Sequence, residues 1–365
     1  VPVATAADPN VFSGCRYDFS QSVDLIPSNE QLTGFLRGTF ALTPDHRLGA
    51  EYVYSNYKSV ARVAAAPTSH LIQATSPYYP VGAPSRDLAK IIPFFGVTDP
   101  NPGGATLGGS ANWRQVPAGQ RTSGDDTTTS RFLVDLEGSL GDGVDYRTAI
   151  GRSSNRATAL VKRGYLNNGI MQKGVWDGII NPFGDQSAAS MALIDSAQVA
   201  ADTRIGKSSV DFVDARVSMD LFKFGAGTVA AAFGFEHRRE KASVVNTDIT
   251  AELPSLGLDP NGDTSGRRNV TALFAELNIP IMKTLEMTLA GRFDKYSDSG
   301  STFNPKIAMK FQPMPELAVR GSINKGFRAP TLYDIYQPQG LTFTSDNYDD
   351  PLLCPGGVPA PGMAE

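Results

Sequence analysis

The feature that most constrains this chain is an alternation of apolar and polar residues with a period of two. From residue 285 to residue 294 the odd positions read Leu, Met, Leu, Gly and Phe, and the even positions read Glu, Thr, Ala, Arg and Asp. A helix would mix these two sets around its circumference, whereas a strand separates them onto opposite faces. The segment therefore predicts a β-strand with one apolar face and one polar face.

The same alternation recurs along most of the chain and predicts about ten strands. Most of these segments are about 10–15 residues long, whereas an ordinary globular strand has ~5–6 residues. A tilted membrane-spanning strand needs ~9–11 residues, which these segments supply. The predicted strands are 31–42, 46–60, 130–140, 144–154, 209–222, 227–241, 267–280, 284–297, 303–312 and 316–324.

The connections between these strands alternate between short and long. Turn residues at 43–45, 141–143, 223–226, 281–283 and 313–314 make the short ones. The long loops are 61–129, 155–208 and 242–266, and the connection at 298–301 is the one short member on that side. Within the long loops only residues 188–201 have a helical pattern. Transmembrane β-barrels have this asymmetry, with short periplasmic turns and longer extracellular loops. The fold class predicted is therefore all-β, an antiparallel transmembrane β-barrel, of which this chain supplies about ten strands.

Composition argues against several other classes of protein. No run approaches the ~18 apolar residues of a membrane helix. The net charge of −4 and the absence of basic runs argue against nucleic acid as a partner. Three histidines, His46, His70 and His237, and two cysteines lie far apart, so no metal site is predicted. No nucleophile motif or phosphate-binding glycine loop is present, so neither an enzyme nor a cofactor is predicted.

The polar faces of the predicted strands carry many charged residues. Ten apolar faces have almost no helix to pack against, so we expect lipid to cover them and the polar faces to line a water-filled lumen. A soluble sheet with one exposed face is the alternative for any single strand. The lumen-facing candidates are Arg37, Glu137, Arg216, Glu236, Arg238, Glu276, Glu286 and Arg320.

The segment from Gly291 to Tyr336 resembles the barrel region of TonB-dependent outer-membrane receptors. In that family a strand ending in Arg-x-Asp-x-Tyr-Ser-Asp is followed by Gly-Ser-x-x-Asn-Pro-Lys, and a later strand ends in Gly-Phe-Arg-Ala-Pro. The residues here that match this signature are Arg292, Asp294, Tyr296, Asn304, Pro305, Lys306, Gly326, Phe327, Arg328, Ala329 and Pro330. For Gly326–Pro330 a structural role at the barrel rim is favoured over contact with a ligand, because proline ends strand pairing.

The resemblance implies a receptor in the outer membrane of a Gram-negative bacterium. Such a receptor takes up a scarce ligand with energy delivered by the TonB complex, and the sequence leaves open a ferric siderophore, haem, cobalamin, an oligosaccharide or a peptide. Its partners are that complex, a plug domain and outer-membrane lipid. A passive porin and a soluble structural or adhesive β-protein are the alternatives. Because nothing in residues 1–365 matches the family's plug domain or terminal strand, we expect the chain to be the middle of a barrel.

Three loop features have open interpretations. Cys15 and Cys354 are predicted on the same outer side, where a disulfide is permitted, but the sequence does not decide how they pair. The run from Asp259 to Asp263 is similar to the start of a calcium loop, yet its glycine is misplaced, so a polar turn is favoured. The acidic cluster Asp346, Asp349 and Asp350 is expected to be solvated rather than to bind a cation.

Overall fold

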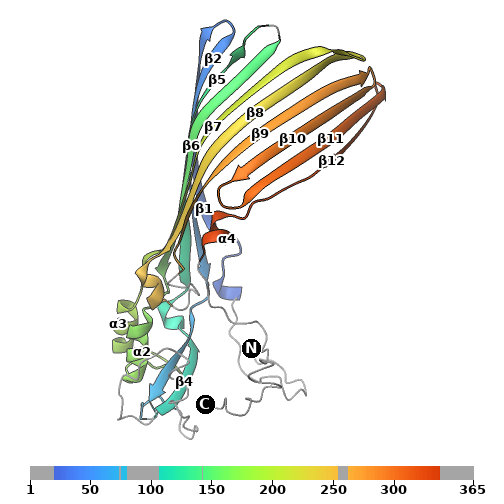
Figure 1. The fold of residues 1–365 in the computed structure, drawn as a ribbon. Helices are drawn as coiled ribbons and strands as arrows, with labels where there is room; N and C mark the ends of the chain where they lie inside the picture. Colours follow the sequence, from blue (N-terminus) through green and yellow to red (C-terminus); the bar gives the residue numbers. More distant parts are fainter. Residues whose placement is uncertain (1–19, 74, 80–106, 142, 254–261, 338–365) are drawn as a thin grey trace, which may run out of the picture.

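The computed structural model describes residues 20–73, 75–79, 107–141, 143–253 and 262–337. Ten long strands form one antiparallel sheet, whose order is β1-β2-β5-β6-β7-β8-β9-β10-β11-β12. Figure 1 shows this sheet as a curved, open wall. The strands are β1 (Ser28–Thr43), β2 (His46–Val63), β5 (Arg121–Ser139), β6 (Val144–Arg163), β7 (Ala201–Phe224), β8 (Gly227–Asn246), β9 (Thr264–Met282), β10 (Leu285–Tyr296), β11 (Gly300–Met314) and β12 (Leu317–Asn324).

All ten predicted strands are present, and every long strand pairs with its neighbour in chain order. Several are longer than predicted, since β6 has 20 residues and β7 has 24. The added residues extend toward the long connections and are rich in Ser and Thr, as in Thr127–Thr129. The extension of β5 over residues 121–129 has no apolar residue and therefore no visible period of two, so the sequence pattern could not reveal it. The predicted loops are correspondingly shorter in the structure.

The two ends of the sheet differ as predicted. At one end, the turn end, neighbouring strands are joined by tight turns such as Pro44–Asp45 and Gly225–Ala226. Gly225 has a φ of +60°, and a Cβ there would lie 2.3 Å from the carbonyl oxygen of Ile281, so the turn requires glycine. The opposite end, the loop end, carries the long connections, apart from the tight turn at 297–299 between β10 and β11.

The connections at the loop end contain a compact subdomain, at the bottom of Figure 1. It consists of a hairpin of β3 (Pro67–Gln73) and β4 (Leu107–Arg114), the short 3₁₀-helix η3 (Val116–Ala118), α2 (Asn168–Trp176) and α3 (Ala188–Ser196). The sequence predicted only one helix, over 188–201. It missed α2 because Gly169 and Gly174 lower the helix propensity, and α3 is shorter than predicted.

The loop-end subdomain has a hydrophobic core of its own. Met171, Val175, Ile180 and Ile194 are each 0% exposed. The side chain of Asn167 caps α2 by accepting a hydrogen bond from the backbone N–H of Ile170 at 3.0 Å. Tertiary packing and this cap therefore hold a helix that its residues alone would not form.

The sheet has no such core, and its two faces differ sharply. Side chains directly opposite one another across a strand pair point to the same face, so the register assigns every residue to a face. One rung of the apolar face joins Leu273, Phe293 and Phe303, which are 56%, 43% and 55% exposed. Among the described residues, no helix combines the length and the apolar character needed to span a bilayer.

Three short elements complete the described chain. They are the 3₁₀-helices η1 (Ser20–Ser22) and η4 (Asp248–Glu252), and the helix α4 (Leu332–Tyr336) that follows β12.

Candidate functional site

The strand register places all eight predicted lumen-facing residues on one face of the sheet, called the polar face below. For example, Glu137 lies opposite Arg147, which lies opposite Arg216 on the next strand. At the other side of the sheet Glu286 lies opposite Lys310, and Lys310 opposite Arg320. The period of two predicted this shared face because it depends only on the strand backbone.

A network of ion pairs joins β8, β9 and β10 on the polar face. The guanidinium of Arg292 contacts Glu236 at 3.0 Å and donates to Asp294 at 2.9 Å. Arg238 pairs with Glu236 on one side and with Glu240 at 2.6 Å on the other. Asp294 is only 5% exposed, so Arg292 compensates a carboxylate that the sheet has largely removed from water.

A second network occupies the polar face of β1, β2 and β5. Arg37 contacts Glu51 at 3.1 Å and Asp135 at 3.4 Å, and Arg131 contacts Glu51 at 3.6 Å. Arg147 of β6 approaches the same Asp135 at 3.8 Å. Asp135 is 1% exposed, so the two arginines on either side of it are needed to hold its charge.

The remaining candidates line cavities near the turn end. Glu137, Arg216 and Glu276 line one of about 580 Å³. Glu286 and Arg320 line another of about 370 Å³. The structure therefore divides the eight candidates between two ion-pair networks and two cavities and does not gather them into one pocket.

The segment after β12 folds back over the polar face at the loop end. The ring of Phe327 lies 5.8 Å from that of Tyr296. Arg268 donates to the carbonyl oxygen of Pro330 at 2.7 Å, pairs with Glu240 at 2.6 Å, and stacks its guanidinium over Tyr296 at 5.4 Å. This arrangement brings three signature residues, Tyr296, Phe327 and Pro330, together on one rim. We call residues 326–336 the strap.

The helix α4 ends the strap and is fixed locally. Thr331 and Asp334 form a reciprocal capping box. Hydrogen bonds from Thr331 hold the pKa of Asp334 below its usual range. The Tyr336 hydroxyl donates to the carbonyl oxygen of Arg267 at 3.5 Å. A Cβ at Gly266 would lie only 2.2 Å from the Tyr336 ring, which is too close for any other residue. Gly266 therefore allows the strap to approach the sheet closely.

The other signature residues are distributed differently. Asn304 lies opposite Arg292 on the polar face, whereas Pro305 lies opposite Gly291 and so belongs to the apolar face. Lys306 lines the cavity that contains Glu286. The signature is therefore a set of structural positions spread over both faces.

The sequence reasoning did not single out three residues that matter in these networks. They are Asp135, Glu240 and Arg268, which contact the predicted residues Arg37, Arg238 and Pro330 respectively. The alternation of faces along β5, β8 and β9 was the available signal, because each of these residues lies an even number of positions from a named candidate on the same strand and so shares its face. What parity could not supply was which of these charges approach one another.

The three histidines have separate environments. The ring of His46 hydrogen-bonds the Tyr146 hydroxyl at 3.1 Å, and that of His237 bonds Thr271 at 2.9 Å. His70 is buried in the loop-end subdomain beside Gln115, and burial lowers its pKa to about 4. In the part of the chain that the structure describes, no three His, Cys, Asp or Glu side chains are grouped to hold a metal ion.

Some predicted features fall outside the described residues. They are Cys15, Cys354, Asp259 and the acidic cluster Asp346, Asp349 and Asp350. Asp263, at the end of the predicted polar turn, accepts a hydrogen bond from the backbone N–H of Asn246 at 2.8 Å.

Comparison with known proteins gave one family and several solved structures. Residues 77–353 match the family model described as TonB dependent receptor-like, beta-barrel. A mutant of the ferric enterobactin receptor PfeA from Pseudomonas aeruginosa is 15% identical, with a TM-score of 0.46 over 84% of this chain and 34% of that one. The siderophore receptor PirA from Acinetobacter baumannii is 12% identical, with a TM-score of 0.44 over 83% and 34%.

Each of these likenesses concerns part of a larger molecule. The RagAB peptide importer is 13% identical, with a TM-score of 0.45 over 78% of this chain and 30% of that one. The chain thus spans about a third of the length of these structures. A search of curated proteins gave no match.

Proposed function

Because the chain belongs to the family of TonB-dependent receptor-like β-barrels, we propose that it is part of an outer-membrane receptor importing a scarce small-molecule ligand, such as a ferric siderophore. Members of this family are transporters in the outer membrane of Gram-negative bacteria. The family match over residues 77–353 carries the proposal, and it agrees with the resemblance of residues 291–336. The import activity is proposed for the complete receptor, which also contains the plug domain and receives its energy from the TonB complex.

In this proposal the polar face is the wall of the lumen. The two ion-pair networks fix carboxylates and guanidinium groups on a stiff sheet, so they form a lining that water wets and that a polar plug domain can contact. Their mutual pairing leaves little net charge at either network. Such a wall suits a passage for polar ligands without holding any one of them tightly.

The apolar face meets lipid in the same proposal. Large side chains such as Phe132 and Ile150 are 52% and 62% exposed there, which would be costly in water. The hydrocarbon of a bilayer removes that cost, and the backbone groups of inner strands are already paired with their neighbours. This assignment supports an outer-membrane location.

The loop end is extracellular and the turn end periplasmic in this arrangement. An epitope tag between Gly184 and Asp185, in the connection between α2 and α3, should react with antibody on intact cells. A tag between Pro315 and Glu316, in the turn between β11 and β12, should react only after the outer membrane is permeabilised. Labelling of the second tag on intact cells would contradict this orientation.

Energised uptake separates a receptor from a porin. Iron-starved cells carrying the complete receptor should accumulate radiolabelled ferric siderophore, and deletion of the TonB complex should abolish the accumulation. Arg292→Gln should lower uptake by weakening the polar wall, whereas Lys295→Gln, three residues away on the apolar face, should not. Uptake that persists without TonB would favour the passive porin, and a protein absent from the outer membrane would favour the soluble alternative.

A further inference from the structure

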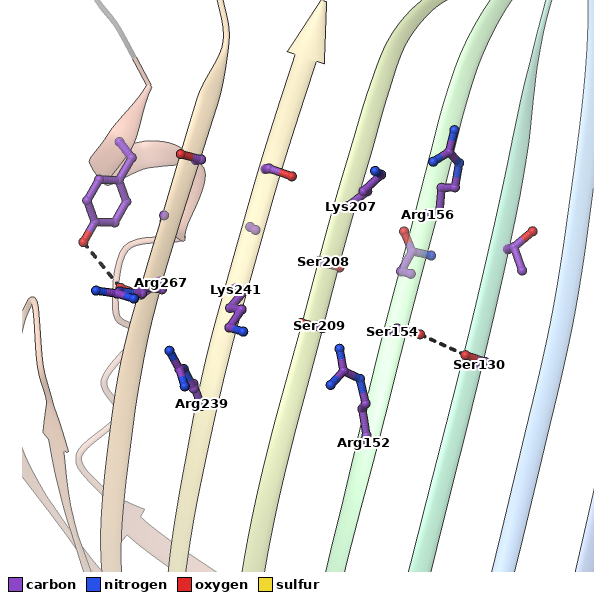
Figure 2. Close-up of a pocket in the computed structure, with 17 residues that line it drawn as sticks. Ser130, Arg152, Ser154, Arg156, Lys207, Ser208, Ser209, Arg239, Lys241 and Arg267 are labelled. Carbon is purple, nitrogen blue, oxygen red and sulfur yellow. Dashed lines mark hydrogen bonds between the residues drawn. The ribbon is translucent and has the colours of Figure 1, made fainter.

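A group of six basic residues lies on the apolar side of the sheet, toward the loop end. Figure 2 shows these side chains on the neighbouring strands β6, β7, β8 and β9. The register places them on the face opposite to the ion-pair networks. They lie closer to the loop end than the apolar residues of the same strands. We call this group the basic strip; its members are Arg152, Arg156, Lys207, Arg239, Lys241 and Arg267.

The basic strip contains two pairs of like charges directly opposite one another. Arg156 of β6 faces Lys207 of β7 across the ladder, and Lys241 of β8 faces Arg267 of β9. Like charges in directly opposite positions destabilise a sheet. A bound anion between each pair would convert that repulsion into attraction.

Within the described residues the basic strip is almost free of acidic partners. Arg152 pairs with Asp211 at 3.2 Å, and the other five side chains form no ion pair with any described residue. All six are exposed. The arginines of the polar face differ, since Arg292 and Arg238 each contact two carboxylates. The strip therefore presents positive charge to whatever lies outside the sheet.

The surface between these basic residues is suited to phosphate oxygens. A groove of about 1010 Å³ is lined by the strip and by hydroxyl groups from the same rungs. Ammonium, guanidinium and hydroxyl groups all donate hydrogen bonds, and charge-assisted bonds to phosphate are among the strongest. The hydroxyl residues on the same face as the strip are Thr128, Ser130, Ser154, Ser209, Ser243 and Ser265.

An apolar groove begins at the lowest rung of the basic strip, where Phe132 of β5 lies opposite Arg152. It has a volume of about 470 Å³, and Phe132, Ile150 and Val213 line it. Arg152 and Arg239 line both grooves. An apolar groove that continues into a cationic one matches an amphiphile with a hydrocarbon chain and an anionic headgroup.

We propose that the basic strip and the apolar groove bind an anionic lipid with two separate phosphate groups. One phosphate lies between Arg156 and Lys207, and the other between Lys241 and Arg267. These pairs are two strands and one rung apart, which is on the order of 10–12 Å. The acyl chains pack on Phe132, Ile150 and Val213. The site rests on the proposed membrane placement of the sheet but needs no transported ligand.

The test measures lipid binding by the complete receptor, purified in an uncharged detergent. The lipid probes are diphosphoryl lipid A, monophosphoryl lipid A and phosphatidylcholine, and inorganic phosphate serves as the competitor. The wild type should bind the diphosphoryl lipid at least 10-fold more tightly than the monophosphoryl lipid. Millimolar phosphate should compete poorly, because it lacks the chains.

Paired variants locate the site. Lys241→Gln combined with Arg267→Gln should weaken diphosphoryl lipid binding 10-fold or more and abolish the preference for two phosphates. It should not lower the melting temperature in the absence of lipid, since it removes a repulsion. The control, Lys223→Gln combined with Lys283→Gln, removes two charges at the turn end and should bind as the wild type does.

Several results would overturn the proposal. They are equal binding of phosphatidylcholine, equal binding by the strip variant, and displacement of the lipid by phosphate alone, which would make the site one for free anions. Uptake and TonB play no part in this assay. A receptor that imports no siderophore can therefore still bind the diphosphoryl lipid at the strip, and a receptor that imports siderophore can lack this lipid binding.

Discussion

The sheet and the loop-end subdomain handle their apolar side chains in opposite ways. In the subdomain Met171, Val175 and Ile194 are fully buried among one another. In the sheet Phe293, Phe303 and Ile307 are 43%, 55% and 47% exposed on one face. The two regions are continuous in the chain, so the difference reflects the surroundings for which each was selected. The subdomain excludes water by itself, whereas the sheet depends on lipid to do so.

The same substitution in the two regions should separate these two ways of stabilising a fold. Ile194→Ala opens a cavity in the subdomain core and should cost about 2–5 kcal/mol of its local stability. Ile307→Ala removes a side chain that faces outward, where a lipid chain can fill the space, and should cost clearly less than Ile194→Ala. Hydrogen exchange of the α2 and α3 amides reports the first effect, and heat-modifiable migration of the barrel reports the second. Equal losses of stability in the two variants would contradict the idea that the subdomain buries its apolar side chains itself whereas the sheet relies on lipid.

The two faces of the sheet should respond differently to a new charge. Leu289→Arg places a guanidinium on the apolar face and should cost about 2–4 kcal/mol of unfolding free energy in bilayers. Ala290→Arg, one residue along, places it on the polar face between Glu276 and Lys306, and should cost much less. Denaturant unfolding in lipid vesicles measures both. The reverse order would invalidate the assignment of faces.

Acid should weaken the subdomain before the sheet. Burial lowers the folded-state pKa of His70 to about 4 from its ordinary value of 6.5. The unfolded subdomain therefore binds a proton at a higher pH than the folded one. Its stability should be constant above pH ~6.5 and fall by about 2–3 kcal/mol as the pH drops toward ~4. Exchange rates of the β3 and β4 amides across this range test it, and His70→Gln should remove most of the dependence.

The smallest expected effect concerns the start of α2. Asn167→Ala removes the side chain that caps this helix and should cost about 1 kcal/mol of subdomain stability. Asn167→Asp keeps an acceptor for the N–H of Ile170 and should cost less. Faster exchange limited to the first turn of α2 is the expected readout. No change in the alanine variant would mean that core packing alone fixes the helix.

The strands and their faces could be predicted because both are local properties of the chain. The pleat of a strand sends successive side chains to opposite faces, so Leu289 and Arg292 could be separated without knowing any neighbour. The strand ends could not be predicted where Ser and Thr replace apolar residues. The helix α2 escaped prediction because its two glycines disfavour it and only the core around Met171 compensates.

By itself the sequence determined a long-stranded antiparallel sheet, its apolar and polar faces, its turn and loop ends, and a family signature around Gly291–Tyr336. The tertiary structure decided which side chains meet. Asp135 lies between Arg37 and Arg147, Arg268 holds the strap, and like charges gather in the basic strip. These contacts depend on the register between strands that are far apart in the chain. A shift of one residue in that register would move every one of those side chains to the other face.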